Sequence, residues 1–392
     1  MSNTRAVADW LVAGAPGATR SEEVLDMLCQ KLVAAGIPLW RVSVFVRTLH
    51  PHIMGRRFSW IPGTAVATSE APFEVLDTDE YLASPVVHVY GTGKTLRRRL
   101  CDPSVSPDFA VLTDLAKDGV TDYVAAPLRF TNGEIHVVSW TTREPRGFTD
   151  AHIAGLAVVE PALARLAEVM ALRRTTRNLL DTYVGTHTGE RILKGQIRRG
   201  DTESIHAAIW LSDMRGFTAL ADRLSPTTLV GLLNAYFDAQ VPAIARHGGE
   251  VLKFMGDGLL AIFPVADGER AAACGAALDA AREARSEIAT LDRSHGIEGV
   301  DRVRFGLALH VGEVLYGNIG GATRLDFTCI GPAVNLAARL EKLAGELGRT
   351  LLASSEYAAF CPTLTPVGRF AVRGIDAAQR VFGLPEEADR GP

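Results

Sequence analysis

Paired cysteines, long apolar runs and a marked excess of charge of either sign are all missing from this sequence. Its five cysteines are scattered and none forms a Cys-x-x-Cys pair, which argues against a disulfide framework or a zinc site. No run approaches the ~18 consecutive apolar residues of a membrane span, and residues 1–20 lack the long apolar core of a secretion signal. The net charge of −4 gives no general attraction to nucleic acid or acidic membranes. We therefore expect a cytoplasmic protein with no membrane span and no nucleic-acid partner.

What is present is an ordinary globular composition, 47% hydrophobic and 22% charged, over 392 residues. That length predicts two or three domains. Changes of pattern along the chain divide it as follows: a flexible N-terminus (1–20), an α/β sensory module (21–157), a charged, partly helical linker (158–203), an α+β module (204–384) and a short tail (385–392).

The first module reads as a helix, strands and a second helix. "SEEVLDMLCQKLVAAG" has helical spacing from Ser21, "RVSVFVRTL" alternates like a strand, and "TDYVAAPLRF" and "EIHVVSWTTR" flank an Asn132-Gly133 turn. The long helical pattern that follows carries an apolar stripe at Val159, Leu163, Leu166 and Met170. The stripe fits either a seam for a parallel partner helix or a face turned to the module's own core.

The second module alternates helices and strands. "HAAIWLSD" predicts a strand buried on both faces, and "SPTTLVGLLNAYFDAQVPAIARHGG" predicts a helix that begins at Ser225-Pro226. "EVLKFM" and "LLAIF" flank "GDG", which is typical of a tight hairpin. An Ala-rich helix, the strand "VRFGLALHVGEVLYGNIG" and the helix "GPAVNLAARLEKLAGELG" complete the core pattern.

Two aspartates are the first candidates for chemistry. Asp213 ends the first strand and Asp257 lies at the hairpin tip, so adjacent antiparallel strands bring them together. Two carboxylates suit Mg²⁺ or Mn²⁺, which leave positions open for substrate phosphates, and this favours phosphoryl or nucleotidyl transfer. Taken singly, Asp213 also fits a helix cap and Asp257 an ordinary turn residue.

Asn335 and Arg339 are the second candidates. They lie four residues apart and therefore share one face of the predicted helix, where the Arg fork suits phosphate oxygens. A solvated polar stripe is the alternative. "GTGKT" (residues 91–95) is not a phosphate-binding loop, because that pattern requires Gly where His88 stands.

Four segments together resemble the catalytic domain of class III nucleotidyl cyclases, in family order: "SDMRGFT", "GGEVLKFMGDGLLAIFP", "HVGEVLYGNIG" and "RLDFTCIGPAVNLAARLE". The resemblance covers about residues 204–384 and implies an α+β, ferredoxin-like βαββαβ fold. "GGEV" (residues 248–251) only superficially resembles diguanylate cyclases, whose fuller signature is absent.

The resemblance implies a role for each matching residue. Asp213 and Asp257, with the backbone carbonyl of Met214, would bind two divalent cations, Mg²⁺ or Mn²⁺. Lys253 and Thr328 fall at the purine-reading positions of a Thr-type adenylate cyclase subgroup, where guanylate cyclases show Glu and Cys. Asn335 would contact the ribose, and Arg339 would contact the α-phosphate in the transition state. The loop of Arg215, Gly216, Phe217 and Thr218 would contact the triphosphate, and Arg373 would contact the terminal phosphates.

The activity implied is conversion of ATP to 3′,5′-cyclic AMP and pyrophosphate by a homodimer with shared sites. A guanylate cyclase and a nucleotide-binding regulator without turnover are the alternatives. The order of elements in the first module resembles a GAF domain, which implies an unidentified small-molecule regulator; a purely dimerising module is the alternative. Metal or haem ligation is conceivable for His50, His52 and His88, but "LHPHI" is more typical of an ordinary loop.

Overall fold

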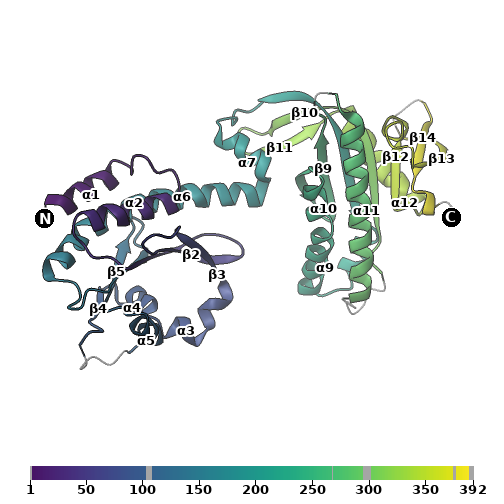
Figure 1. The fold of residues 1–392 in the computed structure, drawn as a ribbon. Coiled ribbons are helices and arrows are strands. Elements are labelled where there is room, and N and C mark those ends of the chain that lie inside the picture. The colour runs from purple at the N-terminus through teal and green to yellow at the C-terminus, as the bar shows by residue number, and fades with distance from the viewer. Residues whose placement is uncertain (1, 103–107, 267, 295–301, 374–376, 388–392) are drawn as a thin grey trace. The chain divides into compact units, whose positions relative to one another are not determined.

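The computed structural model describes residues 2–102, 108–266, 268–294, 302–373 and 377–387 (Figure 1). The chain divides into two compact units, Met1–Leu179 and Leu180–Pro392. No helix within the described residues is long and apolar enough to cross a membrane.

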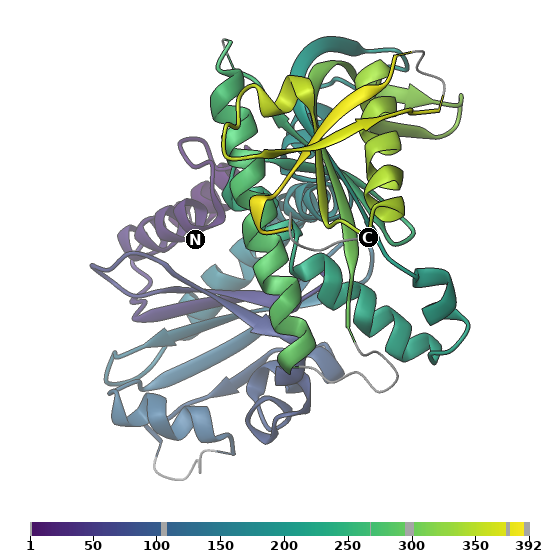
Figure 2. The same ribbon diagram turned by 90° about the vertical axis from the view of Figure 1, so that its right-hand side faces the viewer.

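The first unit is built on an antiparallel sheet with the strand order β3-β2-β1-β6-β5-β4, purple to blue in Figure 2. Its strands are β1 (Arg41–Arg47), β2 (Ile53–Trp60), β3 (Ala67–Pro72), β4 (Leu96–Arg98), β5 (Asp122–Arg129) and β6 (Ile135–Thr142). Its helices are α1 (Ser2–Val12), α2 (Ser21–Ala34), η1 (Phe73–Asp77), α3 (Asp79–Leu82), α4 (Pro85–Thr92), α5 (Ala110–Lys117) and α6 (Asp150–Val184), the last of which runs past the unit boundary.

The N-terminal segment is helical and packed, so the expectation of a flexible stretch over residues 1–20 is wrong. Val7, Ala8, Leu11 and Ala15 are buried in the same apolar cluster as α2 and α6. The Gly and Pro residues that suggested a loose segment, Gly14, Pro16 and Gly17, follow α1, and packing of its apolar face against the domain stabilises the helix.

The apolar stripe of α6 faces the core of its own unit. Val159 and Leu163 are buried there, and Leu166 and Met170 pack against the same cluster. Residues 158–170, which we expected to begin the linker, therefore belong to the first unit, and residues 180–203 belong to the second.

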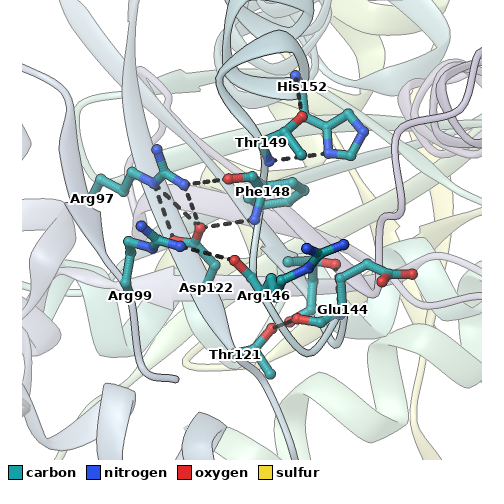
Figure 3. A network of polar contacts seen from close by, with 10 residues as sticks. Arg97, Arg99, Thr121, Asp122, Glu144, Arg146, Phe148, Thr149 and His152 are labelled. Carbon is teal, nitrogen blue, oxygen red and sulfur yellow. Dashed lines mark hydrogen bonds and ion pairs between the residues drawn. The ribbon is translucent and has the colours of Figure 1, made fainter. Parts of the chain in front are cut away.

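A buried ion pair fixes the loop that leads into α6 (Figure 3). Asp122 of β5 is fully buried and lies 2.7 Å from the Arg97 guanidinium of β4. The Phe148 backbone N–H donates to the same carboxylate at 2.9 Å, and Arg97 donates to the Phe148 carbonyl. Removing one partner of such a pair leaves a buried charge unpaired, so this network holds the start of α6 against the sheet.

The second unit has the sheet order β13-β14-β12-β10-β7-β9-β8, with β11 paired to β10. Its strands are β7 (Thr202–Met214), β8 (Glu250–Met255), β9 (Gly258–Pro264), β10 (Phe305–Gly320), β11 (Leu325–Ile330), β12 (Leu351–Ser354), β13 (Thr365–Phe370) and β14 (Gln379–Gly383). Its helices are α7 (Thr186–Leu193), α8 (Phe217–Ala221), α9 (Pro226–Asp238), α10 (Val241–Arg246), α11 (Arg270–Ser294), α12 (Pro332–Glu346), α13 (Ser355–Ala358) and η2 (Pro385–Glu387).

The order β10-β7-β9-β8 with α9 to α11 between its strands is the expected βαββαβ core. One expected helix is broken: the chain between Ser225 and Gly248 forms α9 and α10, with Ala239 and Gln240 between them and Pro242 in the first turn of α10.

The central strand β7 sends alternate side chains to two layers. Ala208 and Trp210 pack with α9, α10 and α11, whereas Ala207 and Ile209 pack with α12. Because side chains alternate, Asp213 continues the series that faces α12.

Candidate active site

The β8–β9 hairpin brings Asp257 next to the end of β7. Met255 pairs with Gly258, so Gly256 and Asp257 form the tight turn, and Gly256 has the positive φ of 70° that such turns favour. A Cβ added to Gly258 would lie 3.2 Å from Asp213 Oδ1, so a bare backbone is what allows the two strands to approach here. The structure thus gathers the two aspartates that the sequence singled out.

The two carboxylates repel one another. Burial raises the pKa of Asp213 to about 7, and the neighbouring negative charge of Asp257 adds to the shift. Both effects disfavour the ionised form of Asp213 when no cation is bound. Among the described residues, no group of three or more His, Cys, Asp or Glu side chains is placed to hold a metal. The carboxylates of Asp213 and Asp257 are hard oxygen donors that would leave positions on a cation open to other ligands. The backbone of Met214 follows directly at the end of β7.

The Arg215 side chain turns toward α12 of its own chain. Its guanidinium lies 2.7 Å from Glu341 Oε1 and donates to the Glu341 carbonyl at 2.9 Å. A Cβ on Gly306 would overlap this guanidinium, so the glycine of β10 opens the path across the sheet. The side chain is thus engaged within its chain, and the Arg215 backbone N–H donates to the Arg304 carbonyl at 2.7 Å, so neither is open to the triphosphate that the resemblance assigns to this loop.

The rest of that loop is short. Gly216 and Thr218 are exposed and Phe217 is half-buried at the start of α8. Their role toward a triphosphate stays a prediction.

A second group of polar side chains gathers where β8 meets β11. Lys253 Nζ lies 3.8 Å from Asp326 Oδ2, and Thr328 follows two residues later on β11. Thr328 is only 4% exposed, and within the described part of the chain its hydroxyl has no hydrogen-bond partner. Burying a hydroxyl without a hydrogen-bond partner costs free energy, so an external polar group that bonds to Thr328 would be favoured at this corner.

The remaining candidates lie on α12 and near the C-terminus. Asn335 is exposed and Arg339 is half-buried, one helical turn apart as the spacing predicted. Arg373 is exposed, next to residue 374, which lies outside the described residues. The functions of all three stay predictions.

Sequence reasoning missed two acids in this region, Glu341 and Asp326. Glu341 is 6% exposed on the apolar face of α12, beside the buried Leu340. The sequence signal that could have identified Glu341 is an acidic residue within the apolar stripe of this helix. Asp326 stands within the segment that carries Thr328, but only the β8–β11 contact shows its pairing with Lys253.

The histidine candidates of the first unit do not form a ligand cluster. The His52 backbone N–H donates to His50 Nδ1 in the loop before β2, while His88 of α4 packs edge-on against Phe109. "GTGKT" lies where α4 ends, with Gly93 as its left-handed cap.

Comparison with known proteins assigns the second unit. Residues 201–382 match the family model of the adenylate and guanylate cyclase catalytic domain. Adenylate cyclase 1 of Rhizobium meliloti is 33% identical over 177 residues, which are 44% of this chain and 26% of the relative. Adenylate cyclase of Anabaena cylindrica is 31% identical over 198 residues, which are 48% of this chain and 37% of the relative. The chain thus spans less than two fifths of the length of these relatives.

Among solved structures, the adenylyl cyclase CyaB of P. aeruginosa is similar with 26% identity and a TM-score of 0.43, covering 46% of this chain and 94% of that one. The guanylyl cyclase Cya2 has 25% identity and a TM-score of 0.42, covering 48% and 97%. The match to the family model lies within the unit that holds the Asp213–Asp257 pair. Residues 201–382 therefore belong to the adenylate and guanylate cyclase catalytic domain family.

Proposed function

We propose that this protein is an adenylate cyclase that converts ATP to 3′,5′-cyclic AMP and pyrophosphate. The observation that carries the proposal is the Asp213–Asp257 pair, where β7 ends beside the β8–β9 turn of a cyclase-family sheet, with a Lys253–Thr328 corner at the β8–β11 contact. In the reaction, a bond forms between the ribose 3′-oxygen and the α-phosphorus. The bond from the α-phosphorus to the bridging oxygen breaks, the 3′-hydroxyl proton passes to solvent, and pyrophosphate leaves.

The carboxylate pair fits two divalent cations, Mg²⁺ or Mn²⁺. Its oxygens are hard donors, and a bound cation would offset the raised pKa of Asp213, which burial and the Asp257 charge cause. Asp213, Asp257 and the Met214 carbonyl would hold the ions. When bound, the ions would lower the pKa of the 3′-hydroxyl and neutralise charge on the phosphates.

The chain's own side chains would position and stabilise the substrate. Asn335 orients the ribose so that its 3′-oxygen lies in line with the bond that breaks, and Arg339 donates to the α-phosphate as charge develops there. Backbone N–H groups of residues 216–218 would face the triphosphate, since the Arg215 N–H is bonded to the Arg304 carbonyl, and Arg373 would contact its end. Positioning and electrostatic stabilisation of this kind supply most of the catalysis in phosphoryl transfer.

Adenine is favoured by the chemistry of the Lys253–Thr328 corner. Adenine presents an amino donor beside a ring-nitrogen acceptor. The unpartnered Thr328 hydroxyl is able to accept or donate, and the Lys253 ammonium donates. The guanine-type residues Glu and Cys are absent from these two positions.

We further propose that the active form is a homodimer. One chain would provide Asp213 and Asp257, and the other would provide Lys253, Thr328, Asn335 and Arg339. Large apolar side chains beside these residues support such an interface, because they are exposed in the single chain: Phe254, Met255, Leu315, Leu325 and Ile330.

The first unit is proposed as a GAF-like regulator of the cyclase. Its antiparallel sheet and the terminal helix α6, which continues in sequence toward the second unit, support this assignment.

Exchange of the two base-reading residues tests the nucleotide assignment. The wild-type protein should prefer ATP over GTP, and Lys253→Glu with Thr328→Cys should shift the ratio of kcat/KM toward GTP by about 10-fold or more, because hydrogen-bonding groups are then matched to guanine. Cys329→Ala, one residue away, should leave the ratio unchanged. An unchanged ratio in a folded double variant contradicts the role of this corner.

A further inference from the structure

The first unit contains an apolar cavity between its sheet and α6. Its lining comes from four elements, α2, β1, β2 and α6, and includes Leu25, Val44, Phe58, Leu163 and Ala167. The hollow measures about 480 Å³ including its open mouth. That volume lies toward the lower end for ligand pockets and suits a small molecule better than a nucleotide.

One cation, Arg174 of α6, stands at this cavity. Its guanidinium donates to Ser21 Oγ at 3.1 Å and lies over the Phe58 ring, 5.2 Å from the centroid. Among the described residues, no carboxylate lies within ion-pair distance of it.

Glu70 and Glu22 interact electrostatically with Arg174 but do not pair with it. Glu70 pairs with Arg56 at 2.6 Å, and Glu22 accepts a hydrogen bond from Thr68. The half-buried guanidinium thus has no carboxylate at hydrogen-bond distance, and an external carboxylate offers it the planar, two-point acceptor that it binds best.

We propose that this cavity binds a small apolar monocarboxylate, with the acid group on Arg174 and Ser21 and the hydrocarbon part among the α2, β1 and α6 side chains. The size of the cavity limits the ligand to about 5–10 heavy atoms. Because α6 forms one wall and continues to Val184, a bound acid would act directly on the helix that leads to the cyclase unit.

The test measures binding to the full chain, so it is independent of cyclase turnover. Butyrate, hexanoate and benzoate are titrated by isothermal calorimetry beside the neutral partners butanol, hexanol and benzamide. At least one acid should bind, about 10-fold or more tightly than its neutral partner. Equal binding of an acid and its neutral partner, or no binding of any acid at millimolar concentration, overturns the proposal.

Two variants locate the site. Arg174→Gln should weaken the acid by about 10- to 100-fold, whereas Arg173→Gln, an exposed neighbour on the same helix, should not. Ala167→Phe fills the cavity from α6 and should abolish binding with the charge retained; thermal melts show that each variant is folded. Unchanged affinity in Ala167→Phe or Arg174→Gln places the acid elsewhere and contradicts the proposal.

Discussion

Replacing Asp257 with Asn is expected to reduce cyclic AMP formation by about 10³-fold or more, because one of the two carboxylates that would hold the divalent cations loses its charge. The measurement is the initial rate with saturating ATP and Mn²⁺ or Mg²⁺, over a range of metal concentrations. Excess metal should restore little of the rate, since the missing negative charge is part of the binding site and not a distant influence on it.

The same variant has a second readout that separates chemistry from folding. In wild-type protein without metal, burial and the Asp257 charge raise the pKa of Asp213 from 3.8 to about 7, so stability falls as pH rises between these two values and the full cost is present at pH 8. Asp257→Asn removes the repulsion. Its metal-free melting temperature at pH 8 should therefore equal or exceed that of the wild type.

Asp222→Asn is the matched control. Asp222 is exposed at the end of α8, and its replacement should leave the rate and the metal dependence unchanged. Normal turnover by Asp257→Asn would remove the basis of the metal-site assignment.

Mixing an Asp213→Ala chain with an Arg339→Ala chain is expected to restore activity that neither has alone. Each site would take its carboxylates from one chain and its Asn335 and Arg339 from the other. In a mixed dimer one site then receives both defects and the other receives none. With random pairing at equal concentrations, about a quarter of the wild-type rate should return, because half of the dimers each carry one intact site.

The rescue has a specific control. A mixture of Asp213→Ala with Asp257→Ala should stay inactive, since both substitutions damage the carboxylate half and every site in a mixed dimer retains one of them. If the Asp213→Ala and Arg339→Ala chains form mixed dimers, as shown by differently tagged chains in native mass spectrometry, and still have no activity, the shared site is refuted.

Local turn chemistry made the central hairpin predictable from the sequence. Gly256 and Asp257 specify a two-residue turn between apolar strands, and β7 was a plain buried run, so the meeting of Asp213 and Asp257 followed from antiparallel pairing. The spacing of Asn335 and Arg339 was equally local, because one helical turn fixes it.

Contacts between distant segments were not predictable in this way. The direction of the Arg215 side chain depends on Gly306 of β10 and Glu341 of α12, neither of which is near it in sequence. The N-terminal helix α1 also escaped prediction, because packing of Val7 and Leu11 against the first unit, and not helix propensity, stabilises it. Turns and helical spacing are encoded locally, whereas side-chain direction and burial depend on what the fold brings alongside.

Product identification with the purified full chain tests the central claim most directly. The protein is incubated separately with ATP and with GTP in Mn²⁺ or Mg²⁺, and nucleotides are separated and identified by mass spectrometry, with Asp257→Asn as the blank. The account predicts 3′,5′-cyclic AMP and pyrophosphate in equal amounts from ATP, and much slower turnover of GTP. Cyclic GMP as the main product, or no cyclic nucleotide from a folded, dimeric protein, would contradict it.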